Sequence, residues 1–163
     1  MDEKRLLRLL ENNAKLTTVD LAMALQESEE TIDSTLRELE TKNIICGYHT
    51  LINWDPMNEN FVQAYIQVQS KPERDFGYDR IAQKIAGFPE VDSLYLLSGA
   101  SEFCVIVKGK TMQEIAHFVG SKLAPMEAIS GTSTLFVLKQ YKKNGVIFDG
   151  QDTHIDKRLV VTP

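Results

Sequence analysis

Apolar residues recur at helical spacing in three short segments near the start of the chain. The first has an apolar stripe from Leu6 to Leu10, which the polar stretch "NNAK" ends. The second is "LTTVDLAMAL", and the turn "QES" separates it from the third, "EETIDSTLREL". In the third, Ile32, Leu36 and Leu39 lie on one helical face. Two short helices joined by a tight turn, the second amphipathic, predict a helix-turn-helix.

Polar residues at the ends of these segments give the predicted helices their boundaries. Thr17 is a suitable N-cap, and Asp20 stands three positions later, where the helix dipole favours an acid. Ser28 caps the third helix, and Asn43 is expected to end it. The next segment, "IICGYHTLIN" at 44–53, has the β-rich composition of a small wing. We therefore expect a winged helix-turn-helix at the N-terminus.

From Phe61 onward the pattern changes to strands separated by helices. "FVQAYIQVQ" alternates apolar and polar positions, whereas "YDRIAQKIAGF" and "TMQEIAHFVGSKL" have helical spacing. Three further segments have strand composition: "VDSLYLLSG", "EFCVIVKG" and "GTSTLFVLKQY". The resulting order, β-α-β-β-α-β, is the ferredoxin-like arrangement. The fold class is therefore α+β, an N-terminal winged helix-turn-helix plus a C-terminal ferredoxin-like βαββαβ domain.

These patterns divide the chain into four parts. Residues 1–52 are the helix-turn-helix domain, 53–60 a polar linker, and 61–142 the ferredoxin-like domain. The tail, 143–163, contains two β-prone pieces, Val146 to Phe148 and Leu159 to Val161. Two interpretations of the tail stay open, a terminal hairpin that packs on a partner subunit and a loose end.

The distribution of charge complicates the helix-turn-helix interpretation. The 163 residues have a formal net charge of -5, and residues 1–50 carry ten acidic against six basic side chains. From Ser28 to Glu40 there are five acids against Arg37. Because DNA is a polyanion bound mainly through Lys and Arg on its phosphates, bulk electrostatics does not attract it to this domain.

The sequence also indicates the cellular compartment of the protein. No apolar run approaches the ~18 residues of a membrane span, and the N-terminus lacks the apolar block of a signal peptide. We therefore expect a cytoplasmic protein with no membrane partner. Cys46 and Cys104 lie in apolar or strand-like stretches, and we expect buried, reduced thiols.

The turn between the second and third strands of the ferredoxin-like domain, Ser98 to Glu102, is the main candidate for ligand chemistry. A glycine there permits close approach of a ligand to the backbone, neighbouring N–H groups can hold a carboxylate, and Glu102 can hold an ammonium. These groups match the two ends of a free amino acid. An ordinary hairpin with an exposed Glu is the alternative. The predicted effector-binding residues are Ser98, Gly99, Ala100, Ser101, Glu102, Thr132 and Thr134.

Catalytic and metal-binding patterns are missing from the sequence. The three histidines are scattered without metal-ligand spacing, and there is no nucleophile motif, P-loop or dinucleotide-binding glycine pattern. We therefore predict no enzyme activity, no metal site and no cofactor.

The chain resembles the Lrp/AsnC, or feast/famine, family of transcriptional regulators over about 140 residues. The resemblance rests on "LRELETKNIICGYHTLIN", similar to the family's helix ending and wing, and on "LLSGASEFCVIVKGKTMQEIAHFV", similar to its glycine turn and following helix. Asn43 stands where the family usually has Gly, and Glu102 where it usually has Asp. The resemblance implies a homodimer with sheets packed face to face, assembly into tetramers or octamers, and a small effector, commonly an amino acid, bound between subunits.

The leading hypothesis is a sequence-specific, double-stranded-DNA-binding transcriptional regulator that responds to an amino acid. Residues at the start of the second helix, along the third helix and after it would contact DNA. They are Thr17, Thr18, Ser28, Glu29, Glu30, Thr31, Ser34, Thr35, Arg37, Lys42 and His49. The alternative is an amino-acid-sensing oligomer whose acidic N-terminal domain binds protein.

Two further functions are known on ferredoxin-like scaffolds. An RNA-recognition sheet needs several aromatic residues in one strand, and "EFCVIVKG" offers Phe103 alone. An acylphosphatase-like enzyme needs a conspicuous Arg in an anion loop, which "SKPERDFG" supplies weakly through Arg74. Both are therefore less favoured than a regulator.

Overall fold

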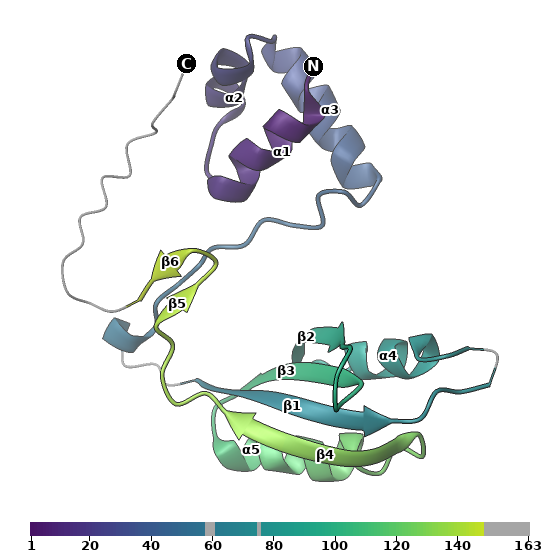
Figure 1. Cartoon of the computed structure of the whole chain (residues 1–163). Helices are drawn as coiled ribbons and strands as arrows, with labels where there is room; N and C mark the ends of the chain where they lie inside the picture. The colour runs from purple at the N-terminus through teal and green to yellow at the C-terminus, as the bar shows by residue number, and fades with distance from the viewer. Residues whose placement is uncertain (58–60, 75, 149–163) are drawn as a thin grey trace. The chain divides into compact units, whose positions relative to one another are not determined.

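The computed structural model describes residues 1–57, 61–74 and 76–148. The chain separates into two compact units, Met1–Ile52 and Asn53–Pro163. The first unit contains the helices α1, α2 and α3, and the second contains a sheet with helices (Figure 1). Each unit is described by itself.

The first unit is a three-helix bundle whose helices begin at the predicted caps. They are α1 (Glu3–Asn12), α2 (Thr18–Leu25) and α3 (Glu29–Thr41). The side chains of Thr17 and Ser28 accept hydrogen bonds from backbone N–H groups of the first turns of α2 and α3. Such caps stabilise a helix by about 1 kcal/mol each. The buried core consists of Leu6, Leu10, Leu21, Ala22, Ile32 and Leu39, as the helical periodicity predicts.

The end of α3 explains the asparagine at position 43. Asn43 has a φ of 54°, in the left-handed region, and the N–H groups of Ile44 and Ile45 donate to the carbonyl oxygen of Leu39. Glycine adopts this conformation most easily and asparagine is the next best choice. Asn43 can therefore end the helix where the Lrp/AsnC pattern usually has glycine.

The strands of the predicted wing at residues 44–53 are not formed in the single chain. Residues 46–52 are described and contain no strand. A β-strand is stabilised by backbone hydrogen bonds to a neighbouring strand. A β-rich composition favours a strand but does not form one without a partner segment. The expected burial of Cys46 is also wrong, because its side chain is exposed; Cys104 is half-buried, and burial raises the pKa of its thiol.

The second unit contains the predicted β-α-β-β-α-β order. After a short 3-10 turn (η1, Asp55–Met57), the elements are β1 (Val62–Ser70), α4 (Asp79–Ala86), β2 (Val91–Leu96), β3 (Phe103–Gly109), α5 (Met112–Phe118) and β4 (Ile129–Phe136). A π-helical turn, η2 (Val119–Leu123), extends α5. The four strands form an antiparallel sheet in the order β2-β3-β1-β4.

The sheet has one covered and one open face. Side chains of β1 and β3 alternate, and one set packs with α4 and α5 in a core that includes Ile66, Val105, Ile85 and Phe118. The open face carries apolar side chains as well, with these exposed fractions: Phe61 50%, Tyr65 40%, Tyr95 53%, Leu135 52% and Ile106 9%. The strand register puts Tyr65 beside Ile106 and Leu135.

A small hairpin follows the sheet. Its strands are β5 (Lys142–Lys143) and β6 (Val146–Ile147), joined by Asn144 and Gly145 with φ angles of 46° and 81°. Asn-Gly with both φ angles positive is the preferred two-residue hairpin turn. The first β-prone piece of the tail, Val146 to Phe148, thus contains the strand β6, which pairs with β5. The second piece, 159–161, lies outside the described residues.

Candidate functional site

A hydrogen bond between side chains joins α2 to α3. The hydroxyl of Thr18, at the start of α2, donates to Oδ1 of Asp33 in α3 over 3.0 Å. Gln26, with a φ of 56°, ends α2 in a left-handed conformation and leads into the cap of α3. The tight turn, the buried leucines and this bond fix the angle between the two helices. The bond links residues 15 positions apart, and no sequence motif indicated it.

The exposed face of α3 is acidic around one arginine. The exposed side chains of α3 are Glu29, Glu30, Asp33, Ser34, Arg37, Glu38, Glu40 and Thr41. Lys42 pairs with Glu38, and this contact raises the pKa of the lysine amine. Arg37 forms no ion pair with any residue that the structure describes. Arg37 is therefore the side chain on this face best suited to bind a phosphate or a guanine edge.

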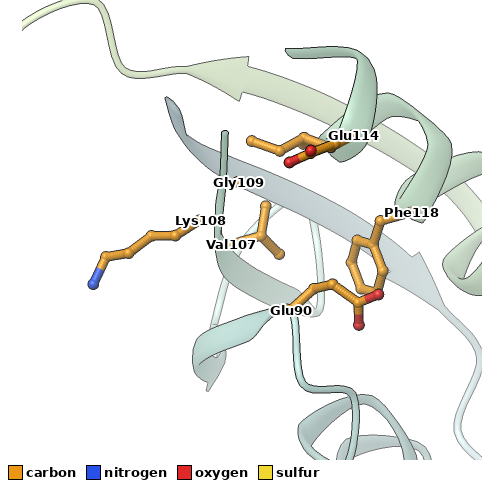
Figure 2. Close-up of a pocket in the computed structure, with 7 residues that line it drawn as sticks. Glu90, Val107, Lys108, Gly109, Glu114 and Phe118 are labelled. Atoms are coloured by element: carbon orange, nitrogen blue, oxygen red, sulfur yellow. The ribbon is translucent and has the colours of Figure 1, made fainter. Parts of the chain in front are cut away.

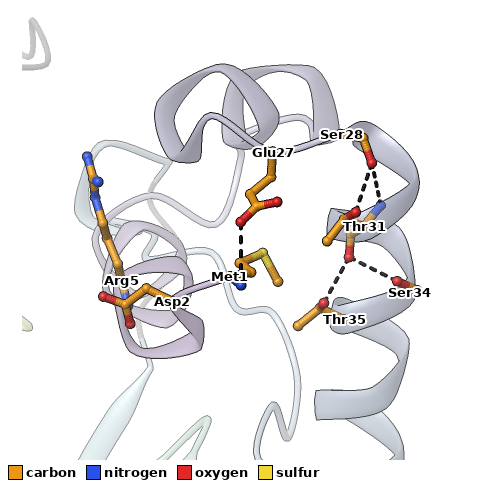
Figure 3. A network of polar contacts seen from close by, with 8 residues as sticks. All are labelled: Met1, Asp2, Arg5, Glu27, Ser28, Thr31, Ser34 and Thr35. Atoms are coloured by element: carbon orange, nitrogen blue, oxygen red, sulfur yellow. Dashed lines mark hydrogen bonds and ion pairs between the residues drawn. The ribbon is translucent and has the colours of Figure 1, made fainter.

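The hydroxyl groups of α3 are satisfied by the helix itself, as Figure 3 shows. Ser34 and Thr35 donate to the carbonyl oxygen of Thr31 over 3.0 and 2.8 Å. The hydroxyls of Ser28 and Thr31 share a 2.8 Å hydrogen bond. Each oxygen keeps lone pairs that can accept from a base amino group.

Two of the residues predicted to bind DNA hold the fold. Thr17 accepts from the N–H of Asp20, and its own N–H and hydroxyl donate to the Asp20 carboxylate. These bonds lower the pKa of Asp20. Thr18 is bonded to Asp33. His49 is exposed in the extended segment after α3. DNA contact by any of these residues stays a prediction.

The predicted effector turn is closed by hydrogen bonds at its base. Leu97 N–H donates to the carbonyl oxygen of Glu102 over 2.7 Å. Oε2 of Glu102 accepts from the N–H of Ser70, at the end of β1, over 2.8 Å. Its other oxygen, Oε1, bonds to none of the described residues. The turn thus holds a half-buried carboxylate with one oxygen available to a ligand, and Ser70 is a supporting residue that the sequence did not indicate.

The apex of the turn is open. Ser98, Gly99 and Ala100 are exposed and Ser101 is half-buried. A Cβ atom built on Gly99 would lie more than 4 Å from the described heavy atoms outside its immediate neighbours. The backbone there is accessible to a ligand, and a side chain at this position would occupy that space.

Thr132 and Thr134 do not join the turn in the structure. Their partners in β1 are Val68 and Ile66, which are buried under the helices. Both threonines are half-buried on that covered face. The hydrogen bonds of the described residues connect the turn to Ser70 and to neither threonine. Their role in effector binding stays a prediction without support from contacts.

A small pocket lies at the opposite end of β3 from the turn (Figure 2). Glu90, Gly109, Glu114 and Phe118 line it, and Lys108 points away from it in the figure. Its volume of about 50 Å³ is far below the ~300 Å³ of a typical ligand pocket. Oε1 of Glu90 pairs with Lys122, and Oε2 is buried without a partner among the described residues. The pocket suits one or two water molecules better than an amino acid.

Comparisons with known proteins identify the family. The profile of the Lrp/AsnC ligand binding domain matches residues 63–147. The HTH-type transcriptional regulator YugG of Bacillus subtilis is 33% identical over 162 residues, which cover 99% of this chain and 96% of the relative. The chain belongs to the Lrp/AsnC family. The leucine-responsive regulatory protein of Rhizobium meliloti is 26% identical, with 86% of this chain and 89% of the relative covered.

A solved structure of a transcriptional regulator agrees in fold. The transcriptional regulator NMB0573 of Neisseria meningitidis, crystallised in complex with L-Met, superposes with a TM-score of 0.65 at 27% identity, covering 83% of this chain and 86% of that one. This chain is thus an effector-responsive transcriptional regulator with a helix-turn-helix and a ligand-binding domain. No helix in the described part of the chain is long and apolar enough to cross a membrane.

Proposed function

We propose that this Lrp/AsnC regulator binds a free amino acid at the Ser98–Glu102 turn and double-stranded DNA through α3. The observation that carries the effector assignment is the half-buried Glu102 carboxylate, which is fixed by Ser70 and has one oxygen available. A carboxylate attracts the ammonium of an amino acid, and exposed N–H groups near Gly99 suit its carboxylate. The L-Met complex of the Neisseria regulator supports an amino acid as the ligand class.

The proposed site needs a second copy of the chain. In one subunit the apex of the turn is exposed, whereas binding sites for small molecules bury most of the ligand surface. The open face of the sheet supplies a reason to associate, because Phe61, Tyr65, Tyr95 and Leu135 remain about half exposed. Several exposed apolar side chains on one sheet face are typical of an interface. We infer a homodimer through this face, which assembles further into tetramers or octamers.

The acidic face of α3 makes DNA binding depend on base contacts. Each phosphate neutralised contributes about -0.9 to the slope of log K against log salt. Two or three contacts per helical unit therefore give a dimer a slope of roughly -4 to -5 from these units. Arg37 supplies the direct readout, and acids such as Glu30 can accept from cytosine N4.

The effector assignment is tested by thermal unfolding with each of the twenty amino acids. A ligand at ~100 times its dissociation constant stabilises the protein by about 2.7 kcal/mol. In Glu102→Gln an amide oxygen can still accept from Ser70, but the charge is lost, so the stabilisation is expected to disappear while the fold remains.

Glu114→Gln is the matched control for this experiment. Oε2 of Glu114 accepts from the N–H of Lys110 over 2.7 Å, much as Glu102 accepts from Ser70, but it lies at the other end of β3. The control is expected to respond to the amino acid like the parent. If no amino acid raises the melting temperature, or if Glu102→Gln responds fully, the site is misassigned.

The alternative function is an amino-acid sensor whose helical unit binds protein. The acidic exposed face of α3 favours this alternative. A gel shift at low salt with DNA from upstream of its own gene separates the two functions, because a sensor of this kind leaves the DNA unshifted with or without effector.

A further inference from the structure

Three lysines lie on or just before the C-terminal hairpin of a protein whose net charge is negative. Residues 128–148 contain Lys139, Lys142 and Lys143 and no aspartate or glutamate. Lys139 and Lys142 are exposed and Lys143 is half-buried. The Lys139 amine lies 4.6 Å from the centroid of the Tyr141 ring. This surface has the opposite charge to the helical unit.

The hairpin presents these lysines on a defined backbone. Lys142 pairs with Ile147 and Lys143 with Val146, and Phe148 N–H donates to the carbonyl oxygen of Tyr141 over 2.9 Å. The Asn-Gly turn matches the right-handed twist of the two strands. Less conformational entropy is therefore lost when the lysines bind a partner than in a disordered lysine-rich tail.

Further lysines lie at the same end of the sheet. The hairpin follows the end of the sheet where β1 begins and where β3 and β4 end. Val62 pairs with Gly109 at this end, and the N–H of Val137 donates to the carbonyl oxygen of Gln63. Lys108 forms an ion pair with Asp92 at this end, and Lys110 follows β3.

Asp92 connects the hairpin to this end of the sheet. Burial would raise the pKa of Asp92, but Lys108 and, more weakly, the charge of Lys143 hold it below its ordinary value. We group the lysines of the hairpin segment with the two near the end of β3 and call them the lysine end: Lys108, Lys110, Lys139, Lys142 and Lys143.

We propose that the lysine end, led by Lys142 and Lys143 on the hairpin, binds the phosphates of duplex DNA outside the helix-turn-helix. The inference rests on the proposed function. Residues 1–50 have a net charge of -4 and offer few phosphate contacts, whereas lysines bind phosphates as point charges without reading sequence. The helical unit selects the site and the lysine end contributes sequence-independent affinity.

The test is a salt titration of DNA binding, followed by fluorescence anisotropy, with the variant Lys142→Gln/Lys143→Gln. The quantity compared is the slope of log K against log salt. If each subunit of a dimer neutralises one phosphate fewer than in the parent, the magnitude of this slope falls by about 1.8. If each subunit neutralises two phosphates fewer, the magnitude falls by about 3.6. We expect this decrease on both the upstream duplex and a scrambled duplex, because binding to phosphates does not depend on sequence.

The control Lys71→Gln/Lys84→Gln removes the same charge elsewhere in the domain. Lys71 follows the far end of β1 and Lys84 lies on α4, and both are exposed. This variant is expected to keep the slope of the parent. Light scattering on both variants checks that the assembly is unchanged.

Three outcomes would overturn the inference. A hairpin variant with the parent slope shows that the lysine end does not bind DNA, while the proposed function stands. A hairpin variant that dissociates into smaller species shows that the hairpin is an interface between copies. A parent that binds no DNA at ~50 mM salt overturns the proposed DNA binding together with this inference.

Discussion

Removing one acidic charge from the exposed face of α3 is expected to strengthen DNA binding. Asp33→Asn is the sharpest change, because the asparagine side-chain oxygen can still accept from the Thr18 hydroxyl that holds α2 to α3. The fold of the helix-turn-helix is therefore retained while the repulsion between Asp33 and the phosphates disappears. The gain applies to any DNA sequence, since phosphates repel the carboxylate everywhere.

The magnitude follows from Coulomb's law. Two unit charges about 8 Å apart in water interact by about 0.5 kcal/mol. Near physiological salt this is about one Debye length, so roughly 0.2 kcal/mol remains per subunit and about 0.4 per dimer, a twofold gain in affinity. At ~10 mM salt the Debye length is ~30 Å, and the gain rises to about fourfold.

The assay is fluorescence anisotropy with the parent and Asp33→Asn at two salt concentrations. Glu11→Gln, at the end of α1, changes the net charge equally and is expected to give a smaller gain. Equal gains from both variants, or weaker binding by Asp33→Asn, would refute the argument that α3 approaches the DNA backbone.

Three other changes probe the cap, the reading helix and the interface. Arg37→Ala is expected to eliminate sequence-specific binding, which competition with scrambled DNA measures; retained specificity would show that Arg37 does not contact bases. Thr17→Ala removes the cap of α2 and lowers the free energy of unfolding by about 1 kcal/mol in denaturant titrations, whereas Thr17→Ser keeps it. The cap lowers the pKa of Asp20, so the ionised Asp20 carboxylate stabilises the fold above about pH 4. This stabilisation is lost as the pH falls through the pKa that Asp20 has in the folded state. A loss of stability in Thr17→Ala that stays the same in acid would contradict this account of the cap. Tyr65→Glu on the open sheet face is expected to give monomers by light scattering, whereas Gln83→Glu on α4 leaves the assembly intact; a dimeric Tyr65→Glu would exclude this face as the interface.

Most helices and strands could be predicted because their signals are local. Thr17 and Ser28 cap helices whose apolar residues recur at helical spacing, and β1 alternates as a strand with one buried face should. The prediction was wrong for the residues after α3. Their composition is β-rich, but a strand needs a partner segment, and the described part of a single chain supplies none.

The contacts that shape the sites depend on residues distant in sequence. The pairing of Ser70 with Glu102 spans 32 positions and follows from the antiparallel register of β1 and β3. The position of Thr132 in its strand indicates the effector site, but the register with β1 puts Thr132 on the covered face. The hairpin at Asn144 and Gly145 has a local signal, the Asn-Gly turn, and its two strands lie on either side of the domain boundary predicted at residue 143.

The central claim, that this chain binds specific DNA under control of an effector, is tested most directly by one anisotropy titration. The parent is titrated onto the duplex from upstream of its own gene and onto a scrambled duplex, between ~50 and ~200 mM salt, with and without the amino acid that raises its melting temperature. We predict binding to the upstream duplex with a slope of roughly -4 or steeper, an affinity that changes with the amino acid, and almost no binding to the scrambled duplex at physiological salt. Binding to neither duplex at ~50 mM salt, with effector present, would contradict the account and favour a helical unit that binds protein.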